Sequence, residues 1–135
     1  MADKQTTLTR QQVADAGLSD WEYVLGNLEA RFETGGFATG LALVDEIGAA
    51  AEAANHHPDI VLTYPVVHVR LVSHDVGGIT SRDIDLARTI SELARARGVS
   101  PTPEKLSRIE IGLDTLNRQG ASRFWAAVLG YNASE

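Results

Sequence analysis

Hydrophobic residues change their spacing twice along this sequence, from every second residue to every third or fourth. Leu28 to Glu33 alternates between apolar and charged side chains, which is typical of a half-buried strand. After Gly35, the apolar residues from Phe37 to about Ala54 lie on one face of a helix. The alternation returns over Val66 to Ser73, and a second helical pattern follows it. Strands in consecutive pairs between amphipathic helices indicate antiparallel ribbons with helices on one face, which is an α+β fold.

Capping and breaking residues set the bounds of these elements. Thr9 predicts the N-cap of a short first helix. Thr80 with Asp83 predicts a capping box at the start of the helix over 80–97. Gly48 lies inside the long helix at a cost of about 1 kcal/mol relative to alanine, so we expect it to pack closely against a neighbour. Pro58 disfavours the helical region for the residue before it and so ends that helix. In order, the sequence predicts a helix over 10–15, strands over 21–24 and 28–33, a helix over 37–54, strands over 59–63 and 66–73, and a helix over 80–97.

Past residue 98, the sequence predicts a separate extension. Residues 99–107 contain two prolines and are expected to form a linker. An apolar run over 109–113 predicts a strand, and residues 122–129 predict a helix. We therefore divide the chain into a main domain over 1–98, the linker over 99–107, and a C-terminal extension over 108–135.

Composition excludes several classes of partner and chemistry. The net charge of −6 opposes binding to nucleic acid or to an anionic membrane, and no apolar run is long enough to span a bilayer. The polar start lacks the apolar stretch of a signal peptide, and the absence of cysteine removes disulfides and thiolate chemistry, so we expect a cytoplasmic protein. Only 6% of the residues are aromatic, which predicts a light core that gains from homo-oligomerisation.

Four histidines lie close together in the sequence, at positions 56, 57, 68 and 74. Imidazole exchanges a proton near neutral pH, so two or three such groups around one pocket supply an acid and a base together. His74 lies at a strand end beside a glycine turn, and Glu52 lies one helical turn before His56, so these side chains can reach one cleft. His68 lies within a strand and is expected to be a surface or hydrogen-bonded residue.

Metal binding and a purely structural function are the two alternatives to catalysis for this histidine group. Metal-binding histidines usually occur one residue apart, or four apart on a helix, with a carboxylate or cysteine completing the set. His56 and His57 are adjacent and point to opposite sides of an extended segment, so they suit a single ion poorly. We therefore expect no metal, while a structural histidine cluster stays open as an alternative.

A longer pattern surrounds these histidines. It consists of Glu52, the run Asn55-His56-His57-Pro58, Tyr64, the pair Ser73-His74, and the segment GITSRDIDLA from Gly78 to Ala87. This pattern resembles the signature of the pterin-4a-carbinolamine dehydratase family, and the resemblance covers about residues 8–97. Trp21 lies where that family often places a pocket tryptophan.

The resemblance implies a four-stranded antiparallel sheet with three helices packed on one face, in the order α-β-β-α-β-β-α, followed here by the strand-helix extension. It implies a cofactor-free lyase that removes water from a 4a-hydroxytetrahydropterin to give the quinonoid dihydropterin in pterin recycling, within a homodimer or homotetramer. By carry-over, His56, His57 and His74 form the catalytic site. The substrate-binding residues carried over are Glu52, Asn55, Pro58 and Trp21.

Two stretches depart from the family pattern. Ile60 and Val61 stand where the family often has an aromatic residue, and Pro65 interrupts the start of a strand. Both departures can alter pterin stacking or subunit pairing. Proteins of this fold also act as dimerisation partners of a transcription factor or assist Rubisco assembly, so a non-catalytic assembly module is the alternative function. The intact histidines favour catalysis.

The C-terminal extension has a resemblance of its own. Residues 108–114, followed by Phe124-Trp125 and a VLGY run that ends at Tyr131, resemble the opening strand and helix of a glyoxalase-like (vicinal oxygen chelate) module. Such a module needs several more strands, so the resemblance implies no glyoxalase activity from this segment alone. An ordinary strand and helix that cover an edge of the main domain are the alternative.

Overall fold

The computed structural model describes residues 6–130 and residue 132, and up to residue 98 it confirms the predicted order of elements. The helices are α1 (Arg10–Asp15), α2 (Phe37–Ala54), α3 (Ser81–Ala96), the short 3-10 helix η1 (Pro103–Lys105) and α4 (Arg118–Leu129). The strands are β1 (Glu22–Val24), β2 (Asn27–Glu33), β3 (Asp59–Thr63), β4 (Val66–Leu71) and β5 (Ser100–Pro101). The predicted N-cap at Thr9 and the predicted capping box at Thr80 both form, and Gln12 makes the Thr9 cap a capping box as well.

The sheet has four main antiparallel strands in the order β1-β2-β4-β3, and β5 pairs with β2 beyond the end of β1. In the central pair, Ala30 lies opposite Val69, and Ile60 lies on the other side of Val69. This register puts the apolar positions of neighbouring strands on the same face, as their alternation predicts. The Tyr64–Pro65 peptide before β4 is cis.

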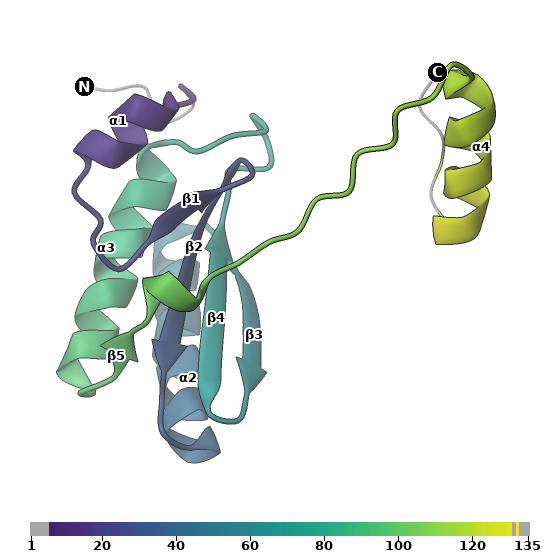
Figure 1. The fold of residues 1–135 in the computed structure, drawn as a ribbon. Helices are drawn as coiled ribbons and strands as arrows, with labels where there is room; N and C mark the ends of the chain where they lie inside the picture. Colours follow the sequence, from purple (N-terminus) through teal and green to yellow (C-terminus); the bar gives the residue numbers. More distant parts are fainter. Residues whose placement is uncertain (1–5, 131, 133–135) are drawn as a thin grey trace.

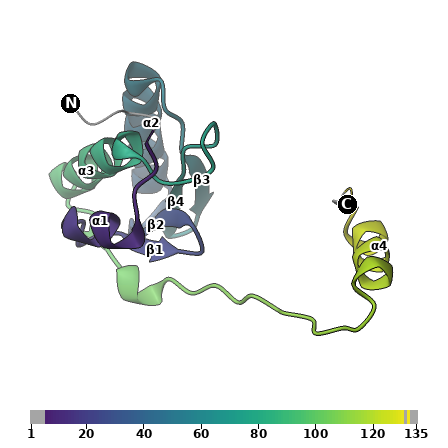
Figure 2. The same ribbon diagram turned by 90° about the horizontal axis from the view of Figure 1, so that it is seen from above.

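The core lies between this apolar sheet face and the layer of α1, α2 and α3 (Figures 1 and 2). Phe32 and Val69 from the sheet, Leu43 and Ile47 from α2, and Ile90 from α3 all have 0% exposure. Burying an aliphatic or aromatic side chain of this size contributes about 1.5–3 kcal/mol, so this single layer of contacts carries the stability of the domain. Among the described residues, no helix combines the length and the apolar character that crossing a membrane requires.

The close approach of α2 to the sheet occurs at Gly40, and the expectation for Gly48 is wrong. A Cβ atom on Gly40 would lie 2.7 Å from Cδ1 of Leu62, which faces it from β3. A Cβ atom on Gly48 would meet nothing within 4 Å. Spacing along the helix cannot distinguish the two glycines, because only the path of β3 determines which helical turn meets a side chain.

The segment expected as a linker is in part bound to the main domain. Val99 is buried, and the backbone N–H of Thr102 donates to the carbonyl oxygen of Arg31 at 2.7 Å. β5 and η1 therefore cover the side of β2 that β1 leaves open. An apolar residue directly after the helix end explains the attachment, since burying it holds the following backbone against the sheet.

Beyond η1, the chain leaves the main domain as an extended arm that carries α4 (Figure 1). Residues 106–117 form neither helix nor strand, so the prediction of a strand over 109–113 is wrong. The segment is extended but has no partner strand within the described chain. The predicted helix is confirmed as α4, which begins at Arg118 rather than at Ser122. Tyr131, the last residue of the glyoxalase-like pattern, lies outside the described residues.

Candidate active site

His56 owes its position to the way in which α2 ends. Asn55 adopts the left-handed conformation, with φ of 47°, and its N–H donates to the carbonyl oxygen of Glu52. The N–H of His56 then returns to the carbonyl oxygen of Ala51 at 3.1 Å, which completes a Schellman-type helix end. Asparagine is one of the few residues besides glycine that adopt this conformation readily. The reversal turns the imidazole of His56 inward, where it is only 8% exposed.

The imidazole of His56 is hydrogen-bonded to the fully buried carboxylate of Asp83. Nε2 of His56 lies 2.7 Å from Oδ1 of Asp83, whose side chain is 0% exposed. The other oxygen, Oδ2, accepts hydrogen bonds from the Ser73 hydroxyl at 2.7 Å and from the Thr80 backbone N–H at 2.8 Å. A carboxylate only accepts, so Nε2 of His56 donates, and in the neutral form of the ring Nδ1 carries the lone pair. Nδ1 has no hydrogen-bond partner among residues 6–130 and 132.

Asp83 belongs to the site but was not among the expected site residues. Its spacing from Thr80 predicts a helix cap, and it does cap α3, but the same carboxylate also holds His56. Nothing in the local sequence distinguishes these two functions. Asp83 does lie within the GITSRDIDLA segment of the family pattern, and that position is the one signal that points to it.

His57 lies next to His56 but on the outside. Its Nε2 atom is 3.0 Å from Oε1 of Glu52, and the two side chains are 56% and 80% exposed. Glu52, one helical turn before His56, therefore contacts His57 rather than His56. Asn55, which precedes the pair, is exposed, and Pro58, which follows it, is half-buried.

His74 lies in the turn that follows β4, and this turn is anchored to the same network. Its neighbour Ser73 donates to Asp83 and forms an isolated bridge with Gly78. Asp75 on the other side accepts a hydrogen bond from Arg82 of α3 at 2.7 Å. That hydrogen bond holds the pKa of Asp75 below its ordinary value, with a smaller effect from the nearby His56. His74 itself is exposed, so the turn presents it to solvent, one residue after the serine that contacts Asp83.

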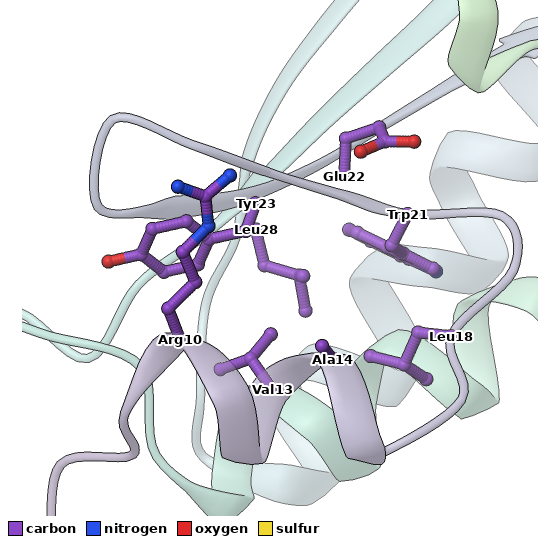
Figure 3. A pocket seen from close by; sticks show the side chains of 8 residues that line it. All are labelled: Arg10, Val13, Ala14, Leu18, Trp21, Glu22, Tyr23 and Leu28. Atoms are coloured by element: carbon purple, nitrogen blue, oxygen red, sulfur yellow. The ribbon is translucent and has the colours of Figure 1, made fainter.

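Trp21 has its own place, which differs from that of the histidines. It is buried against Phe32 in an edge-to-face contact with ring centroids 6.3 Å apart, and its indole N–H donates to Ser91 Oγ at 3.0 Å. It lines a cavity of about 260 Å³ between α1 and β1, together with Arg10, Tyr23 and other residues labelled in Figure 3. No residue of the histidine site lines this cavity.

His68 lies on the other face of the sheet, as its alternation with Val67 and Val69 predicts. It is half-buried, and its Nε2 is 2.9 Å from Oε2 of the buried Glu29. The expectation of a surface or hydrogen-bonded histidine is confirmed. Across residues 6–130 and 132, no cluster of three or more histidine or acidic side chains has a geometry suited to holding a metal ion.

The arrangement offers one buried imidazole that Asp83 orients, and two exposed histidines, His57 and His74, on the adjoining segments. Asp83 fixes the tautomer and orientation of His56, and the orienting carboxylate stabilises the imidazolium that forms when His56 takes up a proton. His57 and His74 are free to rotate toward a bound molecule, because neither is enclosed by the core. Imidazole groups of this kind are chemically able to give and take protons near neutral pH.

Comparisons with known proteins place the site in a family. Residues 5–93 match the sequence model described as pterin 4 alpha carbinolamine dehydratase. A protein of that family from Nocardia farcinica is 43% identical over 90 residues, which span 65% of this chain and 95% of the relative. Another from Thermosynechococcus vestitus is 46% identical over 79 residues, which span 58% of this chain and 83% of the relative.

A solved structure agrees with these sequences. The transcriptional coactivator/pterin dehydratase from Brucella melitensis superposes with a TM-score of 0.63 at 28% identity, covering 66% of this chain and 99% of that one. The family match ends at residue 93, so the glyoxalase-like resemblance of the extension stays a prediction. The match contains all three predicted catalytic histidines and Asp83, and this chain belongs to the pterin-4a-carbinolamine dehydratase family.

Proposed function

We propose that this chain eliminates water from a 4a-hydroxytetrahydropterin and releases the quinonoid dihydropterin, without a metal or redox cofactor. The observation that carries the proposal is the His56–Asp83 pair, buried at the end of α2 within the matched residues. An oriented imidazole with one free lone pair suits general base catalysis. His57 and His74 are exposed and directly follow His56 and Ser73 in the chain, so each is a candidate proton donor.

The reaction requires two proton movements. The C4a–O bond breaks as the hydroxyl receives a proton and leaves as water, and N5 loses its proton as the C4a=N5 bond forms. We assign the base to Nδ1 of His56, because Nε2 is committed to Asp83. We assign the acid to His74, which reaches the ligand from a different element. The net proton count is unchanged, since one proton enters the substrate and one leaves it.

The remaining predicted residues position the pterin. His57 and Glu52 form an exposed hydrogen-bonded pair that can bind the polar edge of the ring. Asn55 and Pro58 flank the histidines and shape the entrance. The contacts of Trp21 support a packing function in its own chain, and a substrate contact by Trp21 stays a prediction.

Alanine substitutions separate these functions. A group that transfers a proton acts in the transition state, so His56→Ala and His74→Ala are expected to lower kcat by about 10²–10⁴-fold after the uncatalysed rate is subtracted. His57→Ala is expected mainly to raise KM, because a positioning group acts equally in the ground and transition states. His68→Ala is the matched control on the opposite sheet face. Full activity in both His56→Ala and His74→Ala would contradict the proposal.

We also propose that the main domain forms a homodimer or homotetramer. β3 is an edge strand whose outer side has no partner in the described chain, and Val61 on it is 55% exposed. An uncovered edge of this kind tends to pair with another strand. Sedimentation equilibrium tests the assembly, and a Val61→Lys variant is expected to weaken it. A monomer at high concentration would contradict it.

A further inference from the structure

The extended arm has an apolar side that nothing covers. Ile109, Ile111 and Leu113 are 88%, 91% and 60% exposed, and they alternate with polar residues or glycine. In an extended segment, residues two apart point the same way, so these three form one apolar stripe. A single chain places this stripe in solvent, which is unfavourable for three large aliphatic side chains.

The helix that follows offers the stripe one apolar wall but does not enclose it. Ala121, Trp125 and Leu129 are spaced four apart on α4, and with Ile111 and Leu113 they line a cavity of about 580 Å³. Trp125 remains 41% exposed and Leu129 remains 64% exposed. The extended segment and α4 together thus form half of a hydrophobic core, and the described residues of this chain do not supply the other half.

The charges along the arm are complementary to those of the same segment in a second copy. When two copies run antiparallel with Ile111 opposite Ile111, Arg108 of each copy lies opposite Asp114 of the other. Ile109 then lies opposite Leu113 on the apolar side. Opposite charges facing each other across an antiparallel pair stabilise it, and so do facing aliphatic side chains.

In-register parallel pairing and the neighbouring antiparallel registers of the same segment bring like charges together. Parallel pairing in register puts Glu110 opposite Glu110 and Asp114 opposite Asp114. The smallest antiparallel shift that keeps the apolar side chains on one face moves one strand by two residues. In one direction this shift puts Glu110 opposite Glu110, and in the other it puts Glu110 opposite Asp114. Like charges directly opposite each other are destabilising. Of the two pairings that align the whole segment, in-register parallel and centred antiparallel, only the centred antiparallel one avoids like charges.

We propose that residues 108–114 of two copies pair as antiparallel strands about Ile111, with an α4 helix from each copy covering the shared apolar side. Arg108 also forms an ion pair with Oε1 of Glu29 in its own chain at 2.6 Å, without the alignment of a hydrogen bond. A guanidinium has five N–H donors, so Arg108 can bind Glu29 and the partner's Asp114 together. The contact is independent of the dehydratase site and of the β3 edge.

Single cysteines test this register directly, because the full chain contains no cysteine of its own. In the proposed pair, Ile111 faces its own copy at a Cα separation of about 4.5–5.5 Å, which a disulfide can span. Ile109 faces Leu113, so the two Ile109 residues are four positions apart along the strands, about 14 Å, which is too far. Ile111→Cys is the test variant, and Ile109→Cys is its control at an equally exposed position.

Under mild oxidation, Ile111→Cys is expected to form a disulfide-linked dimer at least about tenfold faster than Ile109→Cys, since only the former meets the distance limit. The double variant Ile109→Cys/Leu113→Cys is expected to cross-link as readily as Ile111→Cys. Equal rates for the two single variants, or no cross-linking in either, would overturn the proposal. An assembly through the β3 edge alone would bring the arms near each other without this positional preference, so the two contacts are distinguishable.

Discussion

Replacing Asp83 by asparagine removes one charge from the core and keeps the side-chain shape. The wild-type carboxylate accepts from Thr80 N–H and Ser73 through Oδ2 and from His56 through Oδ1. In Asp83→Asn, the amide oxygen is expected to keep the hydrogen bonds to Thr80 and Ser73. The backbone N–H of Thr80 can only donate, so it must face the amide oxygen rather than the amide nitrogen. The amide nitrogen then faces His56 and must donate to Nε2, which moves the imidazole proton to Nδ1.

The magnitude follows from this change of tautomer. With Nδ1 protonated, His56 has no lone pair for the substrate, so the contribution of the base is lost and kcat falls by about 10²–10⁴-fold. This loss corresponds to about 2.7–5.4 kcal/mol in the activation free energy. Stability falls less, by about 1.5–3 kcal/mol, which is the value of one charge-assisted hydrogen bond, because the cap of α3 survives.

Two measurements on one protein sample check this prediction. Dehydratase turnover is measured across substrate concentration after subtraction of the uncatalysed rate, and the free energy of unfolding is measured in urea. Asp85→Asn is the matched control, since Asp85 is an exposed aspartate on the same helix with its side chain 70% exposed. A folded Asp83→Asn variant with kcat within about threefold of wild type, far short of the loss expected for a missing base, would refute the tautomer argument.

Three further predictions concern the scaffold. Gly48→Ala is expected to raise the free energy of unfolding by about 1 kcal/mol. Gly40→Ala is expected to give a free energy of unfolding about 1–3 kcal/mol below that of Gly48→Ala, because its Cβ atom would be crowded. Urea titration of the two variants measures the difference. Asn55→Ala is expected to lower the free energy of unfolding by about 1 kcal/mol, because alanine adopts the positive φ of this position less readily than asparagine. Asn55→Gly is expected to retain stability, and thermal unfolding measures both variants. A hydrogen bond from Arg97 lowers the pKa of Glu46. The Glu46–Arg97 pair therefore adds to the free energy of unfolding above the ordinary glutamate pKa, and this addition is lost as the pH falls through the lowered pKa. Glu46→Gln should therefore flatten the decline of stability in acid, and an unchanged pH profile would contradict this assignment.

The fold could be predicted nearly completely from the sequence because each element signals itself locally. The alternation over residues 28–33 and the helical stripe over 37–54 each fix a structure and a buried face, and Thr9 and Thr80 mark helix starts. Such signals depend only on neighbours in the chain. The strand expected over 109–113 fails for the same reason, since alternation gives the face of a strand but does not supply its partner.

The site was less predictable because its contacts join distant segments. His56 is bound by a residue on α3, and the partner of the Glu52 carboxylate depends on the direction that the chain takes after Asn55. Trp21 has an indole that donates to Ser91 across the core, a contact that no spacing indicates. Sequence patterns identify residue types suited to proton transfer, while the choice of which histidine is enclosed requires the packed structure.

Stability and chemistry are coupled at Asp83 but separate elsewhere in the site. The carboxylate that starts α3 is also the one that orients His56, so a change at either residue alters both the folding free energy and the proposed base. His57 and His74 are exposed and make no contact that the core requires, so their substitution can change substrate handling at little cost in stability. The base is therefore the constrained part of the site, and we expect specificity for the pterin to vary through the exposed residues around it.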